Sequence, residues 1–562
     1  MSKGYLCLFL HAHLPFVRHP EEDNFLEENW LYEAITETYI PLLDMFSSLQ
    51  DEQIPFRLTM SLTPPLVCML RDELLRQRYI RHIDRLIELA EKEVVRTTLL
   101  PDYHDLALMY RKRFVDTKNS FVNRYAGDLV SAFRQFQESG VLEIVASCAT
   151  HGFLPNLRVT PESVRAQIHI GIDHYIRTFR CQPRGFWLPE CGYYPGLDEE
   201  LAEAGIRYFF LDSHGILNGD PKPRYSVYAP VFCPTGVAAF GRDGESSKQV
   251  WSSKDGYPGD SDYREYYRDI GFELELDYIG PYIHDNTIRV NTGVKYWRIT
   301  GNTEQKEPYR VDAAMRKAAE HAGNFMFNRE KQIEHLAAHM DRKPIVVAPY
   351  DAELFGHWWY EGPQFIEFLI RKLHTDQKTV AMITPSEYLA EYPANTMSLP
   401  SASSWGHKGY SEYWLAESNE WLYRHLHVAA TRMVELAGRL KLLTNDKSLE
   451  RRAINQAGRE LVLAESSDWP FIMRTGTMVP YANKRIRQHI GRFTRLYEEI
   501  KAGTINKLFL EMVEYFDNAF YDLECGKYYI EAPQKKNRKV TQKKRSDRKT
   551  VHKKRARDIR PK

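Results

Sequence analysis

The sequence predicts an α/β fold over residues 1–400, followed by an all-helical region. Short apolar runs recur in the first part, and stretches with helical periodicity lie between them. Such alternation is typical of βαβ units with a parallel sheet. Polar and charged residues directly follow several apolar runs, as they do in parallel α/β barrels, where the loops after the strands carry the chemistry. After residue 401 the strand-like runs stop, and helical patterns continue from residue 412 to residue 523.

The expected elements follow from these runs in chain order. The predicted strands span residues 5–10, 56–61, 141–147, 185–188, 208–211, 344–349 and 379–383. The predicted helices span residues 66–93, 119–138, 161–179 and 312–340, and a shorter helix ends at residue 204. Residues 218–282 are rich in Gly, Pro, Tyr and Asp and show no clear period, so we expect a long functional loop there.

Composition excludes several classes of protein. The formal net charge is +1, so the body of the chain is not a bulk binder of nucleic acid. No run of about 20 apolar residues occurs, so we expect no membrane span. The N-terminus lacks the features of a signal peptide, and the seven cysteines show no metal-ligand spacing. These observations predict reduced thiols and a cytoplasmic protein, and we expect neither a metal nor a cofactor.

The basic segment at residues 534–562 differs from the rest of the chain. It is dense in Lys and Arg and contains almost no apolar residues. Such a segment cannot build a packed core, so we expect it to be disordered. A solubilising role is favoured over a loose contact with a polyanion such as RNA.

Acidic residues and histidines stand where several predicted strands end. His11, His13 and His151 follow two strands, Glu190 follows a third, and Asp351 ends a fourth. Residues at the same end of a barrel converge on one site. Two carboxylates in such a cleft indicate glycoside chemistry, in which one is the nucleophile and the other the general acid and base. In a retaining enzyme the two carboxyl groups lie about 5 to 5.5 Å apart.

Each part of this pattern has an alternative interpretation. Glu190 alone fits the cap of the helix that follows it. His11 and His13 with an acidic residue form the weak signature of a metal-dependent hydrolase. However, the chain contains no HExxH motif, and Trp358 and Trp359 crowd the loop after Asp351. Indole rings stack on sugar rings, so this pair favours a carbohydrate site, although it fits a protein core as well.

The ordered set of motifs resembles glycoside hydrolase family 57, in its subgroup of 1,4-α-glucan branching enzymes. The matching motifs are HAHLP at 11–15, LEI at 142–144 with THGFLP at 150–155, WLPEC at 187–191, YDAELFGHWWYEG at 350–362 and SDWP at 467–470, the last followed by TG at 475–476 and YA at 481–482. One motif alone would be weak, but all of them occur in the family's order.

The resemblance implies a fold, a reaction and a set of site residues. The implied fold is a distorted (β/α)7 barrel at residues 1–400, with an inserted subdomain at about 191–245 and a C-terminal helical domain at 401–533 that closes the cleft. Glu190 is the implied nucleophile and Asp351 the implied acid and base. The implied substrate contacts are His11, His13, His151, Arg264, Gly280, Trp405, Asp468 and Thr477, with Trp414 as a further candidate.

The chain departs from the family pattern in two places. Many relatives carry a glutamine at the position of Thr477, and threonine is shorter. Branching members also shield the intermediate from water with a mobile loop that has a tyrosine near its tip. The matching stretch here, residues 234–244, contains Phe240 but no tyrosine, which leaves transfer and hydrolysis open.

The expected activity is that of a 1,4-α-glucan branching enzyme acting on α-glucan polysaccharide in glycogen-type metabolism. An α-amylase or a 4-α-glucanotransferase on the same scaffold is the first alternative. A metal-dependent polysaccharide deacetylase and a glucan-binding protein without activity are the others. Oligomeric state and the length of transferred chain do not follow from the sequence.

Overall fold

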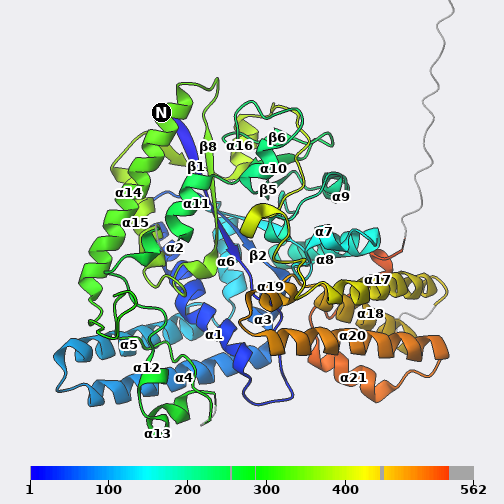
Figure 1. Cartoon of the computed structure of the whole chain (residues 1–562), viewed down its shortest axis with the longest axis horizontal. Helices are drawn as coiled ribbons and strands as arrows, with labels where there is room; N and C mark the ends of the chain where they lie inside the picture. The colour runs from blue at the N-terminus through cyan, green and yellow to red at the C-terminus, as the bar shows by residue number, and fades with distance from the viewer. Residues whose placement is uncertain (1, 253–255, 285–286, 444–447, 531–562) are drawn as a thin grey trace, which may run out of the picture. The chain divides into compact units, whose positions relative to one another are not determined.

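The computed structural model describes residues 2–252, 256–284, 287–443 and 448–530. The basic segment predicted at 534–562 lies outside the described residues. Within the described part, a curved sheet of parallel strands is surrounded by helices, and the C-terminal helices α17, α18, α20 and α21 stack together beside it (Figure 1). The fold predicted from the sequence, a (β/α)7 barrel with an all-helical C-terminal region, is confirmed.

Seven parallel strands form the wall of the barrel, in the order β7-β5-β4-β3-β2-β1-β8. The ring is completed by one backbone hydrogen bond of 2.9 Å, from Asp243 N just after β7 to Val347 O in β8. The short β6 pairs antiparallel with β7, and β9 pairs parallel with the start of β1. The strands are β1 Gly4–Ala12, β2 Leu58–Leu62, β3 Leu142–Ser147, β4 Gly185–Trp187, β5 Tyr208–Leu211, β6 Val231–Phe232, β7 Ala238–Gly241, β8 Ile345–Asp351 and β9 Val380–Met382.

Alternate residues of these strands fill the barrel interior. Cys7 and Phe9 of β1 point inward, because residues two apart share one face of a strand. Phe9 stacks on Trp187 of β4, with ring centroids 4.8 Å apart. The interior is therefore a packed aromatic core, and the space for a ligand lies above it, at the carboxyl ends of the strands.

Strand β7 corrects one expectation from the sequence. Residues 234–244 were expected to match the family's mobile loop, with Phe240 but no tyrosine in it. Phe240 instead lies within β7, has no solvent exposure and contacts Phe210 in the barrel interior. The short run Val237 to Gly241 is flanked by Gly and Pro and lies in the segment 218–282, which shows no clear period. The sequence therefore did not predict a strand there. The same result places β5 and β7 of the barrel wall inside the range 191–245.

The helices around the barrel cover its outer face. They are α1 Asn29–Ala34, α2 Ile40–Asp51, α3 Pro64–Arg71, α4 Glu73–Arg96, α5 Pro101–Asn119, α6 Leu129–Glu138, α7 Leu154–Leu157, α8 Pro161–Phe179, α9 Leu197–Glu203, α10 Ser213–Leu217, α11 Gly244–Trp251, α12 Ile270–Glu273, α13 Leu276–Ile279, α14 Val311–Ala337, α15 Gly362–Thr375 and α16 Pro385–Glu391. Their long members confirm the α/β alternation read from the sequence.

Two predicted helices have different limits in the structure. The helix predicted at 66–93 is two helices, because Asp72 ends α3 and caps α4 by accepting a hydrogen bond from Leu75 N. The helix predicted at 119–138 is interrupted, since a π-helix at Ser120–Arg124 continues α5, the chain turns at 125–128, and α6 begins at Leu129. The buried positions of α5 do follow helical spacing, but its many charged residues masked the pattern.

The C-terminal region consists of helices packed around one central helix. The helices are α17 Trp421–Leu440, α18 Leu449–Ala464, α19 Asp468–Thr475, α20 Val479–Ala502 and α21 Lys507–Phe516. Helix α18 contacts α17, α20 and α21, and its residues from Gln456 to Ala464 are all buried. A helix that is buried on every side is the core of its region.

Contacts between α18 and the barrel position the start of α19. Gln167 Nε2 of α8 donates a hydrogen bond of 2.9 Å to Glu465 Oε2, and Thr150 donates to the carbonyl of Val462. A backbone bridge joins Gly152 to Ser466. These contacts fix Ser467 and Asp468 above the carboxyl ends of the strands.

Candidate active site

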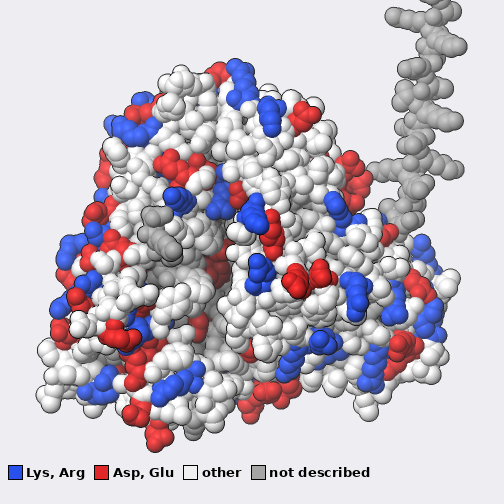
Figure 2. All heavy atoms as spheres, viewed as in Figure 1, with Lys and Arg blue, Asp and Glu red and all other residues white. Residues whose placement is uncertain are grey.

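One large cavity opens at the carboxyl ends of the barrel strands, with a volume of about 1430 Å³. The face of the molecule in Figure 2 is hollowed near its centre. The cavity brings together most of the residues predicted from the sequence. Those that line it are His11, His13, His151, Glu190, Arg264, Asp351, Trp405, Trp414 and Asp468.

Glu190 sits in a strained turn just after β4. Its φ of 60° lies in the left-handed region, which a non-glycine residue adopts at a cost of about 1 kcal/mol or more. The turn is held because the carbonyl of Glu190 accepts a hydrogen bond of 2.8 Å from Trp405 N. This geometry aims the carboxylate into the cavity instead of toward the following helix, so a role as helix cap is excluded.

The carboxylate of Glu190 accepts two hydrogen bonds. Trp405 Nε1 donates to Oε2 at 2.7 Å, and Ser467 Oγ donates to Oε1 at 2.9 Å. Burial raises the pKa of Glu190 to about 7, while both donors act in the opposite direction by favouring the ionised form. Both donors lie C-terminal to residue 400, so the helical half of the chain completes the environment of this carboxylate.

Asp351 is the last residue of β8 and lies in register with His11 on the neighbouring β1. No residue that the structure describes donates a hydrogen bond to its carboxyl group. Burial raises the pKa of Asp351 well above its ordinary value, and the charges of Glu353 and Glu190 raise it further. Asp351 thus lacks the hydrogen-bond donors that favour the ionised form of Glu190, so the two carboxyl groups have different environments.

Of the three histidines, one forms an ion pair with a carboxylate, and the other two have neutral rings. His13 Nε2 lies 3.0 Å from Asp468 Oδ2, and this carboxylate outweighs burial and raises the pKa of His13. Burial alone would raise the pKa of Asp468, but the charge of His13 lowers it to about 2. Burial lowers the pKa of His11 and of His151 well below the ordinary value, and the charge of His13 adds to this effect. Positive charge in the histidine cluster therefore resides on His13.

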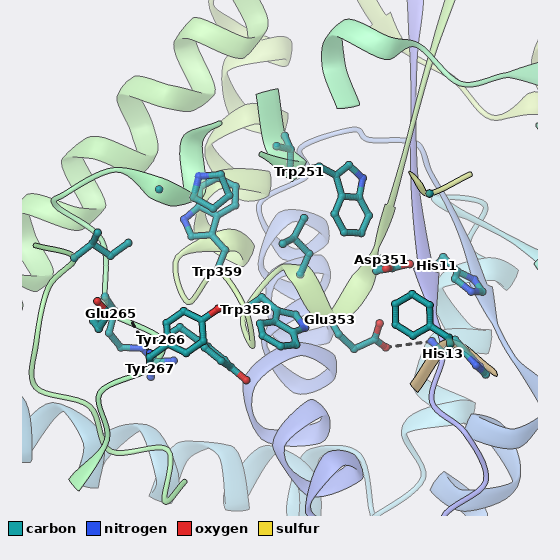
Figure 3. Close-up of a pocket in the computed structure, with 18 of the residues that line it drawn as sticks. His11, His13, Trp251, Glu265, Tyr266, Tyr267, Asp351, Glu353, Trp358 and Trp359 are labelled. Carbon is teal, nitrogen blue, oxygen red and sulfur yellow. Dashed lines mark hydrogen bonds between the residues drawn. The ribbon is translucent and has the colours of Figure 1, made fainter. Parts of the chain in front are cut away.

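Glu353 supports the floor of the cavity. Its Oε1 accepts hydrogen bonds from Tyr39 OH at 2.5 Å and from His13 N at 3.1 Å (Figure 3). The sequence showed Glu353 only as a neighbour of Asp351. Its position next to both Asp351 and His13 makes it part of the electrostatic environment of the site.

Aromatic side chains form two walls of the cavity. Trp405, Trp414 and Phe471 come from the C-terminal part of the chain, whereas Tyr266 and Trp358 come from the barrel side. Figure 3 shows Trp358 and Tyr266 across the pocket from Asp351 and His11. The two adjacent tryptophans noted in the sequence have different surroundings, since Trp358 is 53% exposed and Trp359 only 2%. Flat aromatic faces in an open cavity are suited to sugar rings.

Three of the predicted substrate contacts differ from the expectation. One has its side chain packed into the cavity wall, and two do not line the cavity. The Arg264 side chain is buried in the wall, over the ring of Tyr360 and 3.5 Å from Glu37 Oε1. Gly280 is buried in a turn beside α4 and does not line the cavity. Thr477 is exposed, and it also does not line the cavity.

Some residues of the site were missed from the sequence: Trp251 and Arg242 line the cavity, and Ser467 lies just behind it. Ser467 holds Glu190, Trp251 at the end of α11 faces Trp405, and Arg242 follows β7 next to the same indole. They stand on elements whose ends were uncertain, so their convergence could not be predicted. Only Ser467 carried a signal, its place beside Asp468 in the SDWP motif.

The residues proposed for a metal assemble only in part: His13, His151 and Asp468 each bring a ligand atom within 4.8 Å of the others, close enough for a metal ion, whereas His11 lies outside this group. His11 is hydrogen-bonded through both ring nitrogens, to Ser61 Oγ and to His151 Nε2. His13 Nε2 is paired with Asp468. These nitrogens contact protein groups in the structure, and His13 and Asp468 form an ion pair with each other.

A barrel cavity with two partly buried carboxylates in different environments, lined by histidines and indoles, defines an enzyme that cleaves or transfers glycosides. The profile of "Glycosyl hydrolase family 57" matches residues 7–400. The chain belongs to this family, as its motifs predicted. A second profile, "1,4-alpha-glucan branching enzyme, C-terminal", matches residues 425–528.

The chain is similar both to proteins named as branching enzymes and to a protein named as an alpha-amylase. It is 34% identical to the 1,4-alpha-glucan branching enzyme of Thermococcus kodakarensis, over 94% of this chain and 79% of that protein. The crystal structure of the branching enzyme of Pyrococcus horikoshii is 32% identical, with a TM-score of 0.84 over 95% of this chain and 98% of that one. The crystal structure of an alpha-amylase of Thermotoga maritima is 46% identical, with a TM-score of 0.88 over 94% of this chain and 100% of that one.

Proposed function

We propose that the protein is a 1,4-α-glucan branching enzyme, which cleaves an α-1,4 glucan and transfers the fragment to form an α-1,6 branch. One observation carries this proposal. The region that matches the branching-enzyme C-terminal profile contains Ser467 and Asp468, which contact Glu190 and His13 in the cavity. The branching-type region is thus part of the catalytic environment itself.

The proposed reaction uses the two carboxylates in separate roles. Asp351, protonated in the free enzyme, donates its proton to the glycosidic oxygen while Glu190 attacks the anomeric carbon. The bond to the leaving chain breaks, and a covalent glycosyl-enzyme forms. Asp351 then takes the proton of a glucan 6-hydroxyl, which attacks the anomeric carbon and releases Glu190. Two inversions preserve the α configuration.

The remaining groups hold the reacting sugar and limit the access of water. His11, His13, His151 and Asp468 present a ring of polar atoms beside Glu190. Trp405 packs over the same carboxylate and donates to it. Transfer instead of hydrolysis requires that an acceptor chain occupy the cavity during the lifetime of the intermediate. The indoles and phenols of the two walls supply surfaces for such a chain.

We also propose a role in glycogen biosynthesis and a cytoplasmic location. All seven cysteines lie in the described part of the chain and are free thiols, five of them buried. Free thiols fit a reducing compartment. As to membranes, none of the described helices combines the length and the apolar character that a span needs.

An α-amylase is the second candidate function. The observation that favours it is the 46% identity with the structure of an alpha-amylase, together with a TM-score of 0.88. Both functions use the same carboxylates and the same intermediate. They differ in the acceptor, which is water in the amylase and a glucan hydroxyl in the branching enzyme.

Incubation with amylose separates these functions. Proton NMR measures α-1,6 linkages, and a reducing-end assay measures hydrolysis. New α-1,6 signal with few new reducing ends supports branching, whereas reducing ends without α-1,6 signal identify an amylase. Redistribution of chain lengths with neither signal identifies a 4-α-glucanotransferase. Amylose that is left unchanged would revive the deacetylase and the binding-protein hypotheses.

A further inference from the structure

A continuous row of hydrogen bonds runs from the barrel wall to the carboxylate of Glu190. Ser61 Oγ of β2 lies 2.6 Å from His11 Nδ1, and His11 Nε2 lies 3.0 Å from His151 Nε2. His151 Nδ1 lies 2.8 Å from Ser467 Oγ, which donates to Glu190 Oε1 at 2.9 Å. Ser61, His11, His151 and Ser467 are each at most 2% exposed, so water does not compete along the row.

The direction of every proton in this row follows from its last bond. A serine hydroxyl has one proton, and Ser467 uses it in the hydrogen bond that it donates to the carboxylate. His151 Nδ1 must then carry a proton and donate it to Ser467 Oγ. A neutral imidazole has only one N–H, so His151 Nε2 is an acceptor, and His11 Nε2 donates to it. By the same count, His11 Nδ1 carries no proton and accepts a hydrogen bond from the hydroxyl of Ser61.

The surroundings keep both rings in the neutral state that this count requires. Burial lowers the pKa of His11 and of His151 well below the ordinary value, and the charge on neighbouring His13 adds to it. The ring of His13 stacks on His151 with centroids 3.9 Å apart. A second positive charge beside it would be repelled, so protonation is confined to the pair of His13 and Asp468.

We infer that Ser61, His11, His151 and Ser467 form a directional hydrogen-bond relay that fixes the tautomers of both histidines and keeps the nucleophile ionised and oriented. Ser467 is a positioning residue in this relay, because it acts through Glu190. The inference rests on the proposed role of Glu190. It assigns to Ser467, from the C-terminal region, a function that a direct contact of His151 cannot replace, since His151 Nδ1 lies 3.6 Å from Glu190 Oε1.

The first test uses Ser467→Ala, Ser467→Thr and Ser61→Ala. A hydrogen bond to a charged group contributes roughly tenfold to a hundredfold in an equilibrium constant. We expect Ser467→Ala to lower kcat by about tenfold or more at nearly unchanged KM, and to move the acidic limb of the kcat/KM profile upward by about one pH unit. Threonine should restore both. Ser61→Ala should move the same limb in the same direction by a smaller amount.

A matched control is Ser147→Ala. Ser147 is a buried serine of β3 that donates to the carbonyl of Trp187 and stands outside the relay. The Ser147→Ala substitution should leave the acidic limb of the kcat/KM profile at the same pH, even if the variant is less stable. The other titratable groups near Glu190 are His13, Asp351 and Asp468, and the variants leave them intact. If Ser61→Ala leaves the limb in place while Ser467→Ala moves it, the relay is overturned and Ser467 acts alone.

The second test reads the tautomers directly. Proton–nitrogen correlation spectra of enzyme labelled at histidine distinguish an Nδ1–H from an Nε2–H ring, and His11→Gln and His151→Gln assign the signals. We expect Nε2–H for His11 and Nδ1–H for His151. The opposite tautomer at either ring overturns the relay. Failure of the proposed function is separate, because it would appear as normal activity in Glu190→Gln.

Discussion

At the scale of single residues, the site depends on two carboxylates whose environments differ. Glu190 accepts hydrogen bonds from Trp405 and Ser467, whereas Asp351 is buried beside Glu353 without such a donor among the described residues. Hydrogen bonds to the ionised form favour it, and neighbouring negative charge disfavours ionisation. These two environments within one cavity support the proposed roles of Glu190 as nucleophile and Asp351 as acid.

Replacing the nucleophile should abolish turnover without unfolding the chain. Glu190→Gln keeps the shape of the side chain but removes the charge that attacks the anomeric carbon. We expect transfer and hydrolysis of amylose to fall by at least about a thousandfold. The matched control is Glu307→Gln, an exposed residue paired with Arg298, which should keep wild-type activity. Normal activity in Glu190→Gln, with a wild-type circular dichroism spectrum, would remove Glu190 from the mechanism.

The pKa shifts predict the pH dependence. Activity needs Glu190 ionised, and burial raises its pKa to about 7, so kcat/KM should fall as the pH drops through that region. It also needs Asp351 protonated, and burial raises that pKa well above the ordinary value, so kcat/KM should fall again at higher pH. The measurement is kcat/KM between pH 4 and pH 10. An acidic limb near 4.5, the ordinary range of a glutamate, would show that burial does not control Glu190.

The sequence was sufficient to predict most single residues of the site. Glu190, Asp351 and the three histidines follow short apolar strands, and the parallel barrel brings strand ends together. Gly280 and Thr477 were assigned by motif position alone, and the structure places neither on the cavity. Ser467 and Trp251 were missed because their contacts with the site depend on the packing of distant elements.

At the scale of elements, β7 shows where sequence patterns fail. A strand of four residues has room for only two inward side chains, here Ala238 and Phe240. The equally short β4 and β5 were predicted, so length alone does not hide a strand, but the Gly and Pro that flank β7 suggest a loop. The longer strands β1 and β8 were predicted within three residues of their limits because their apolar runs are continuous.

The assignment of Phe240 to the barrel core can be tested by stability. Phe240→Ala removes a ring packed against Phe210 and Tyr208, so it should lower the free energy of unfolding by about 3 to 5 kcal/mol. The control Phe272→Ala, at a residue that is 50% exposed, should change it by less than about 1 kcal/mol. Urea unfolding followed by circular dichroism measures both. If both substitutions change the free energy of unfolding by the same small amount, Phe240 lies in a surface loop and not in the barrel core.

At the scale of the whole chain, buried charges connect the helical region to the barrel. Asp517 is fully buried and pairs with Arg485 and Arg492 of α20. Close by, Arg18 of the barrel side donates to Asp72 and to the carbonyl of Phe516. The described residues accordingly belong to one compact unit.

Removing the charge of Asp517 should weaken the whole unit. Asp517→Asn leaves the buried guanidinium group of Arg485 and the partly buried one of Arg492 without their carboxylate, and we expect a loss of about 3 to 5 kcal/mol in unfolding free energy. Asp522→Asn is the control, because its pair with Arg177 is partly exposed and contributes about 0 to 1 kcal/mol. Tryptophan fluorescence and circular dichroism should report one common transition. Separate transitions would show that barrel and helical region unfold independently.

The positions of the two donors to Glu190 also bear on synthesis of the protein. Trp405 and Ser467 follow the nucleophile by 215 and 277 residues, and a ribosome completes the barrel strands before either donor exists. A nascent barrel therefore carries its carboxylates but lacks the groups that arm and shield them. The complete environment of Glu190 therefore forms only with the last third of the chain, and we expect an unfinished polypeptide to be less active than the finished one.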